Sequence, residues 1–106
     1  LDNIDLIKGN FSFTLDEVLE KTESFDLVFF DGNHSKIDTL NYFNKCLKKI
    51  NSKSIFVFDD INWSIEMKSA WNQIIKNDMV TLSFSFMRVG VLFFKKDLKN
   101  KNYNFL

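Results

Sequence analysis

Proline is absent from this chain of 106 residues, and glycine occurs only three times. The first residue is leucine rather than methionine. Together these features indicate part of a longer protein that is trimmed at its N-terminus. Because the chain contains no internal repeat and no linker between domains, we interpret residues 1–106 as a portion of a single domain.

The chain also has a single cysteine and no net charge. The single cysteine, Cys46, cannot form an internal disulfide, which suits a reducing cytoplasm, and we interpret it as a small buried hydrophobic residue. Lys plus Arg and Asp plus Glu number 14 each, so the neutral chain gives no electrostatic reason to expect nucleic acid or a membrane as a partner. We find no signal peptide and no apolar run long enough to span a bilayer. We therefore expect a cytoplasmic protein.

Hydrophobic residues are plentiful, at 45% of the chain with 13 phenylalanines, and two apolar runs organise the sequence. One reads Phe-Asp-Leu-Val-Phe-Phe-Asp-Gly-Asn-His at 25–34, and the other Ile-Phe-Val-Phe-Asp-Asp-Ile-Asn-Trp at 55–63. Each run is too short for a helix and is typical of a strand buried on both faces. One helical pattern lies between them, which predicts a βαβ unit whose parallel strands end at the same edge of a sheet.

The remaining patterns predict three alternations of strand and helix followed by two strands in a hairpin. Such an order favours an α/β fold with a mostly parallel sheet, helices on both faces and an antiparallel pair at the end. The expected strands are 4–8, 26–30, 54–58, 80–86 and 89–94, and the expected helices are 14–22, 35–50 and 64–77.

Several residues predict how these elements begin and end. We expect Thr14, Ser35 and Ser64 to cap the helices, and residues 51–53 to form a turn. Gly90 inside a strand indicates close packing against its backbone. The Lys- and Asn-rich tail at 96–106 is expected to fray, although its aromatic residues could dock on the sheet.

Acidic side chains stand at the ends of the two central strands: Asp31 after the first, and Asp59 and Asp60 after the second. Three carboxylates at one edge repel one another unless a positive group lies between them. Aspartate oxygens suit a hard cation such as Mg²⁺. The alternative is that these acids cap the helices that follow.

Two other residues at this edge have two interpretations each. His34, the only histidine, can act as a general base near neutral pH, or it can position a ligand or remain exposed to solvent. Trp63 can form an aromatic wall for a substrate or cofactor, or it can pack against the start of the following helix. Trp71 lies at helical spacing and is interpreted as a core residue.

The quoted runs resemble the second half of a class I S-adenosylmethionine-dependent methyltransferase, closest to small bacterial members with Asp-Gly-x-His after the fourth strand. The similarity covers residues 4–95. It implies a Rossmann-like three-layer sandwich that is incomplete at its N-terminus, with the last strand inserted next to the fifth strand of the family. It also implies methyl transfer to an oxygen of a small molecule, with S-adenosylmethionine as cofactor and Mg²⁺ as a further candidate.

The resemblance also implies roles for individual residues. Asp31, Asp59 and Asp60 fall on positions that hold a divalent cation in the metal-dependent O-methyltransferases. His34 stands where catechol-type members have a lysine base, and Asp31 is the second candidate catalytic residue. Asn10, Phe11, Asp31 and Gly32 are the expected cofactor contacts, and Trp63 is the expected substrate contact.

The family's glycine-rich loop and its ribose-binding acid have no counterpart, because no Gly-x-Gly occurs in the chain. The resemblance therefore implies that the fragment alone is inactive. It also leaves the strand at 26–30 as an apolar edge, which can pair with another chain and form a homodimer. Two alternative functions remain: a non-catalytic methyltransferase-like interaction domain, and a Mg²⁺-dependent phosphohydrolase, which Asp31-Gly32-Asn33 fits less well because it lacks the second acid of Asp-x-Asp.

Overall fold

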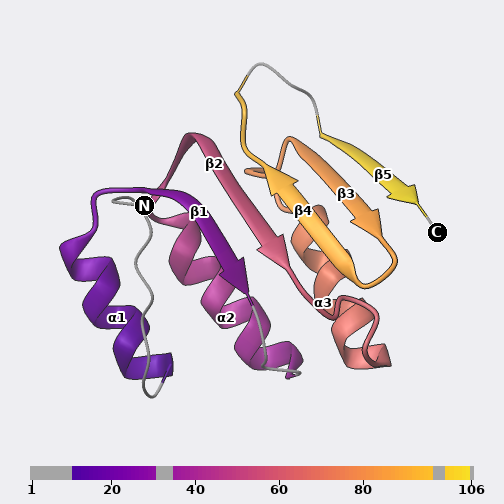
Figure 1. Cartoon of the computed structure of the whole chain (residues 1–106), viewed down its shortest axis with the longest axis horizontal. Helices are drawn as coiled ribbons and strands as arrows, with labels where there is room; N and C mark the ends of the chain where they lie inside the picture. The colour runs from indigo at the N-terminus through magenta and orange to yellow at the C-terminus, as the bar shows by residue number, and fades with distance from the viewer. Residues whose placement is uncertain (1–10, 31–34, 97–99, 106) are drawn as a thin grey trace.

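A computed structural model of the chain describes residues 11–30, 35–96 and 100–105, and Figure 1 shows three helices against a five-stranded sheet. The elements in chain order are α1 (Phe11–Lys21), β1 (Phe25–Phe30), α2 (Lys36–Leu47), β2 (Ile50–Phe58), α3 (Ile65–Ile75), β3 (Leu82–Phe86), β4 (Val89–Phe93) and β5 (Lys101–Phe105). The strand expected at 4–8 lies outside the described residues. None of the described helices is both long and apolar enough to cross a bilayer.

The sheet has the order β1-β2-β4-β3-β5. Strands β1 and β2 are parallel and joined through α2, which confirms the predicted βαβ unit. Strand β4 pairs antiparallel with both β2 and β3, so the final hairpin inserts its second strand next to β2, as expected. The carboxyl ends of β1 and β2 therefore share one edge of the sheet.

The three described helices all lie on the same face of the sheet (Figure 1). One hydrophobic core joins them to it, with Leu15 from α1, Phe43 from α2 and Trp71 from α3 packed around Phe56 and Leu92. We expected helices on both faces, and the described residues supply a layer on one face only. The opposite face of the sheet is apolar as well, because the central strands have hydrophobic residues on both sides.

Helices α2 and α3 begin where their capping residues predict. The hydroxyl oxygen of Ser35 accepts a hydrogen bond from the backbone of Asp38, and that of Ser64 accepts one from Met67 at 3.1 Å. The predicted start of α1 at Thr14 was wrong, because the helix begins at Phe11 and Thr14 lies inside it. Nothing between residues 11 and 14 is a helix breaker, so the first turn extends beyond the expected cap.

Two expectations about irregular segments were also wrong. Residues 51–53 lie within β2, although they bulge from it: Phe25 pairs with Ile50 whereas Leu27 pairs with Ile55. The tail does not fray over 101–105, because these residues form β5 beside β3. The ring of Tyr103 stacks on Phe84 with centroids 5.4 Å apart, so aromatic docking orders the segment.

Trp71 explains the glycine in β4. A Cβ atom at Gly90 would overlap the indole ring of Trp71, which confirms the close packing expected there. The indole N–H of Trp71 donates to the hydroxyl of Ser85 on β3 at 2.7 Å, so its one polar atom is satisfied in the core.

Candidate functional site

The ends of β1 and β2 are joined by a hydrogen bond at the predicted edge. The backbone N–H of Asp59 donates to the carbonyl oxygen of Phe30 at 3.0 Å. Asp59 therefore lies beside the last residue of β1. Four predicted site residues, Asp31, Gly32, His34 and Asn10, lie outside the described residues, and Phe11 is described only as the first residue of α1.

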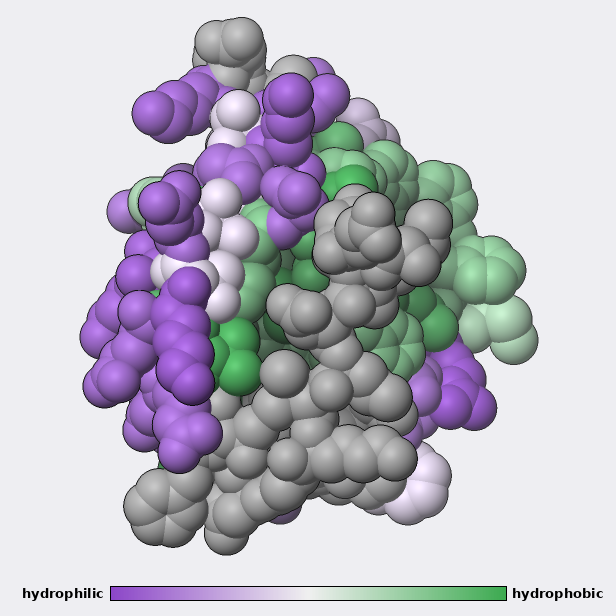
Figure 2. Space-filling model, turned by 60° about the vertical axis from the view of Figure 1, so that its left-hand side comes forward, coloured by the Kyte–Doolittle hydropathy of each residue, from purple (hydrophilic) through white to green (hydrophobic). Residues whose placement is uncertain are grey.

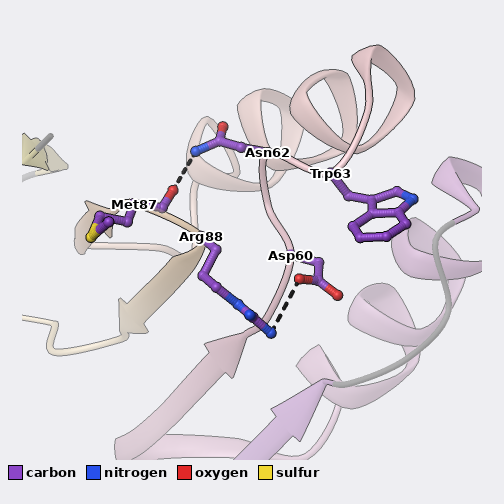
Figure 3. A pocket seen from close by; sticks show the side chains of 5 residues that line it. All are labelled: Asp60, Asn62, Trp63, Met87 and Arg88. Carbon is purple, nitrogen blue, oxygen red and sulfur yellow. Dashed lines mark hydrogen bonds and ion pairs between the residues drawn. The ribbon is translucent and has the colours of Figure 1, made fainter.

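The positive group at this edge is Arg88, from the turn between β3 and β4. Its Nε and a terminal nitrogen donate to the two carboxylate oxygens of Asp59 at 2.9 and 2.8 Å. The same terminal nitrogen lies 3.4 Å from the Oδ1 atom of Asp60 (Figure 3). Both aspartate side chains are only 16% exposed, so the guanidinium offsets part of the negative charge of two carboxylates that are largely withdrawn from water.

Backbone hydrogen bonds fix the positions of Asp59, Asp60 and Arg88. Asp60 has a positive φ of 60°, which aspartate tolerates better than most residues, and its N–H donates to the Oδ1 atom of Asp59 at 2.9 Å. The N–H of Ile61 donates to the carbonyl oxygen of Arg88 at 3.0 Å. The loop after β2 is therefore fastened to the β3–β4 turn, and the ion pair does not depend on side chains alone.

An open pocket of about 500 Å³ adjoins this cluster, lined by Asp60, Asn62, Trp63, Met87 and Arg88. In Figure 3 Asp60 lies between the guanidinium of Arg88 and the indole of Trp63. Trp63 is 63% exposed, and the amide of Asn62 donates to the carbonyl oxygen of Met87, which also lines the pocket. The pocket thus offers an aromatic surface next to a carboxylate.

The predicted Mg²⁺ site is not supported by the residues that the structure describes. Both oxygens of Asp59 are used by Arg88, which supplies the positive charge that the sequence predicted between the acids. No group of three metal-ligating side chains occurs among the described residues. The alternative of helix capping is wrong for Asp59 and Asp60, because Ser64 caps α3.

The part that Arg88 plays in the site was not predicted from the sequence. Arg88 is nonetheless the only arginine in a chain whose other strong bases are lysines. Arginine is the side chain that pairs with a carboxylate through two parallel hydrogen bonds, so a single arginine between two strands was a usable signal.

Residues 1–61, more than half of the chain, match the family described as "Methyltransferase domain". The matched segment contains α1, β1, α2, β2 and both Asp59 and Asp60, whereas Trp63 and Arg88 follow it. No curated protein matches the chain.

Proposed function

This chain belongs to the methyltransferase domain family, whose enzymes use S-adenosylmethionine, and we propose that its acidic strand edge serves methyl transfer to an oxygen of a small molecule. The observation that carries the proposal is the hydrogen bond from Asp59 to Phe30, which brings the ends of β1 and β2 together. Open α/β sheets bind their ligands at the carboxyl ends of the strands.

The described side chains suit a cationic cofactor. Two carboxylates and one guanidinium leave this cluster with a net charge of −1. The exposed indole of Trp63 adds a π-face that attracts cations. S-adenosylmethionine carries a positive sulfonium, so an edge with this charge and this aromatic group favours its binding.

S-adenosylmethionine supplies an electrophilic methyl group when bound. The methyl group would pass to a hydroxyl oxygen of the acceptor, leaving S-adenosylhomocysteine, and the hydroxyl proton would pass to a base of the protein. His34 is the proposed base, because its imidazole accepts a proton near neutral pH. Trp63 is the proposed wall that orients the acceptor, and Asn10, Phe11, Asp31 and Gly32 remain the proposed cofactor contacts.

The proposed methyl transfer includes no step at a metal ion. The pairing of Asp59 and Asp60 with Arg88 leaves the two acids poorly suited to hold Mg²⁺, since the guanidinium already occupies their shared side. Proton removal from the acceptor then depends on His34 rather than on a Lewis acid.

Calorimetric titration of the full-length protein with S-adenosylmethionine tests the proposal. We expect measurable affinity, and we expect Asp60→Asn to weaken it about tenfold, equivalent to about 1.4 kcal/mol. Asp78→Asn is the matched control, because it removes an exposed carboxylate outside the site. Absence of binding by the wild-type protein would favour the non-catalytic alternative.

A further inference from the structure

The two-residue turn between β3 and β4 contains a residue in an unfavourable backbone conformation. Met87 has a positive φ of 54°, in the left-handed region where hairpin turns usually place glycine or asparagine. The side chain of Met87 gains little packing in return, because it is 63% exposed. Such a conformation persists only where neighbouring groups hold it, so the contacts of the Met87 backbone are of interest.

Hydrogen bonds hold this turn from two sides. On one side, the amide of Asn62 donates to the carbonyl oxygen of Met87. The backbone N–H of Ile61, on the same side, donates to the carbonyl oxygen of Arg88 at 3.0 Å. On the other side, the backbone N–H of Met87 donates to the carbonyl oxygen of Phe105 in β5 at 3.3 Å. The turn is therefore held between the loop after β2 and the strand β5.

Strand β5 is an addition to the sheet that the family resemblance implies, which ends with the antiparallel pair, here β3 and β4. It pairs parallel with β3, and all five of its residues are exposed. The rings of Tyr103 and Phe105 stack on Phe84 with centroids 5.4 and 6.2 Å apart. These rings lie on the sheet face that no described helix covers, and Figure 2 shows hydrophobic residues on that side of the molecule. Ring stacking and strand pairing therefore hold β5 in place.

Both residues of the turn belong to the candidate site. Met87 and Arg88 line the pocket, and the guanidinium of Arg88 binds Asp59 and Asp60 (Figure 3). The side chain of Arg88 is 67% exposed, so packing restrains it little. Its reach towards the two acids therefore depends on where the turn holds its backbone. A turn that relaxed at Met87 would move Arg88 away from them.

We propose that β5 is a positioning element of the candidate site. Its docking on β3 holds the unfavourable turn, and the turn holds Arg88 against Asp59 and Asp60. Tyr103 and Phe105 are positioning residues, because they act through Arg88. The proposal concerns how the acidic cluster is assembled, so it can fail or hold separately from the proposed methyl transfer.

Nuclear magnetic resonance of the Arg88 Nε–H in the full-length protein tests this proposal, and loss of the signal in Arg88→Lys identifies it. We expect slow exchange of this proton with solvent in the wild type, because it is donated to Asp59 at 2.9 Å. Tyr103→Ser in the intact chain, and deletion of residues 101–105, should each accelerate the exchange about fivefold or more, because the turn then opens more often.

Magnesium alone provides a second readout. When Arg88 leaves the two acids, their oxygens become available to a cation, so Mg²⁺ should raise the thermal midpoint of both β5 variants and not that of the wild type. Asn51→Ala is the matched control. It also removes hydrogen bonds between neighbouring segments, to Ser24 and Asp26, but at the opposite end of β1 and β2.

A purely structural strand would give a different result. Both β5 variants would then lose stability while folded protein kept slow Arg88 exchange and showed no response to Mg²⁺, and this outcome would overturn the proposal. Equal acceleration of the exchange in Asn51→Ala would also overturn it, because the effect would follow from general loss of stability. Circular dichroism at the temperature of each measurement establishes that the variants are folded.

Discussion

At the scale of single residues, the site depends on Arg88. The guanidinium joins two adjacent aspartates that would otherwise repel each other, and it reaches them from a different part of the chain. The sequence predicted the need for a positive group because the acids are visible in it. It could not predict which group, since the contact spans 29 residues and depends on how the β3–β4 turn folds back.

The first prediction concerns divalent cations. Replacing Arg88 with glutamine should destabilise the protein by about 1–2 kcal/mol, because a largely buried carboxylate loses two charge-assisted hydrogen bonds. Millimolar Mg²⁺ should then raise the thermal midpoint of Arg88→Gln and leave that of the wild type unchanged. The double variant Asp59→Asn with Arg88→Gln is the control, and it should lose the response. A clear rise for the wild type would show that the acids bind Mg²⁺ despite Arg88.

The second prediction concerns Cys46. Burial raises the pKa of its thiol from 9.0 to about 12, because the thiolate is poorly solvated in the core. A thiol reagent at pH 8 should therefore react slowly with the native protein and fast with the unfolded one. The folded state binds this proton more tightly, so the contribution of Cys46 to stability is complete below pH 9 and declines between pH 9 and about 12. Fast labelling of native protein would contradict the burial.

At the scale of elements, hydrophobic periodicity and capping residues predicted most of the helices and strands. Alternating apolar residues predicted β3, a run that is apolar on both faces predicted β4, and helical spacing with Ser35 and Ser64 predicted α2 and α3. Two segments were predicted wrongly, because tertiary contacts determine their secondary structure. Residues 51–53 have turn-forming composition yet stay in β2 as a bulge, and residues 101–105 form a strand because β3 offers a free edge with Phe84 in reach.

The third prediction concerns the contact between α3 and β4. Gly90→Ala should destabilise the protein by about 1–3 kcal/mol, because the added methyl group forces the buried ring of Trp71 to move. Urea unfolding followed by tryptophan fluorescence measures the change. Ser85→Ala is an informative companion, since it keeps the space but removes the partner of the indole N–H. Full stability of Gly90→Ala would show that the ring is not fixed there.

The fourth prediction concerns the start of α3. Ser64→Ala should cost about 1 kcal/mol of stability, because the backbone N–H of Met67 loses its hydrogen-bond acceptor. Denaturant unfolding gives the value, with Ser64→Asp as the control because aspartate keeps a capping oxygen at this position. Equal stability of Ser64→Ala and the wild type would mean that the cap contributes little.

At the scale of the whole molecule, two surfaces of different character emerge from one sheet. Charged residues lie at the strand ends, and apolar residues lie on the sheet face that no described helix covers. Sequence patterns predicted the parallel pair β1 and β2, the meeting of their ends and the antiparallel hairpin, whereas the insertion of β4 beside β2 was implied only by the family resemblance. They did not predict that the described helices occupy a single face, since amphipathic spacing shows that a helix packs on a sheet but does not show on which side.

The central claim, that the ends of β1 and β2 form the methyl-transfer site, is tested most directly by a crystal structure of the full-length protein with S-adenosylhomocysteine. We expect the ligand to lie against residues 31–34 at the ends of β1 and β2, with Arg88 still paired with Asp59. A ligand at the opposite edge of the sheet, or a metal between Asp59 and Asp60 with Arg88 displaced, would contradict this account.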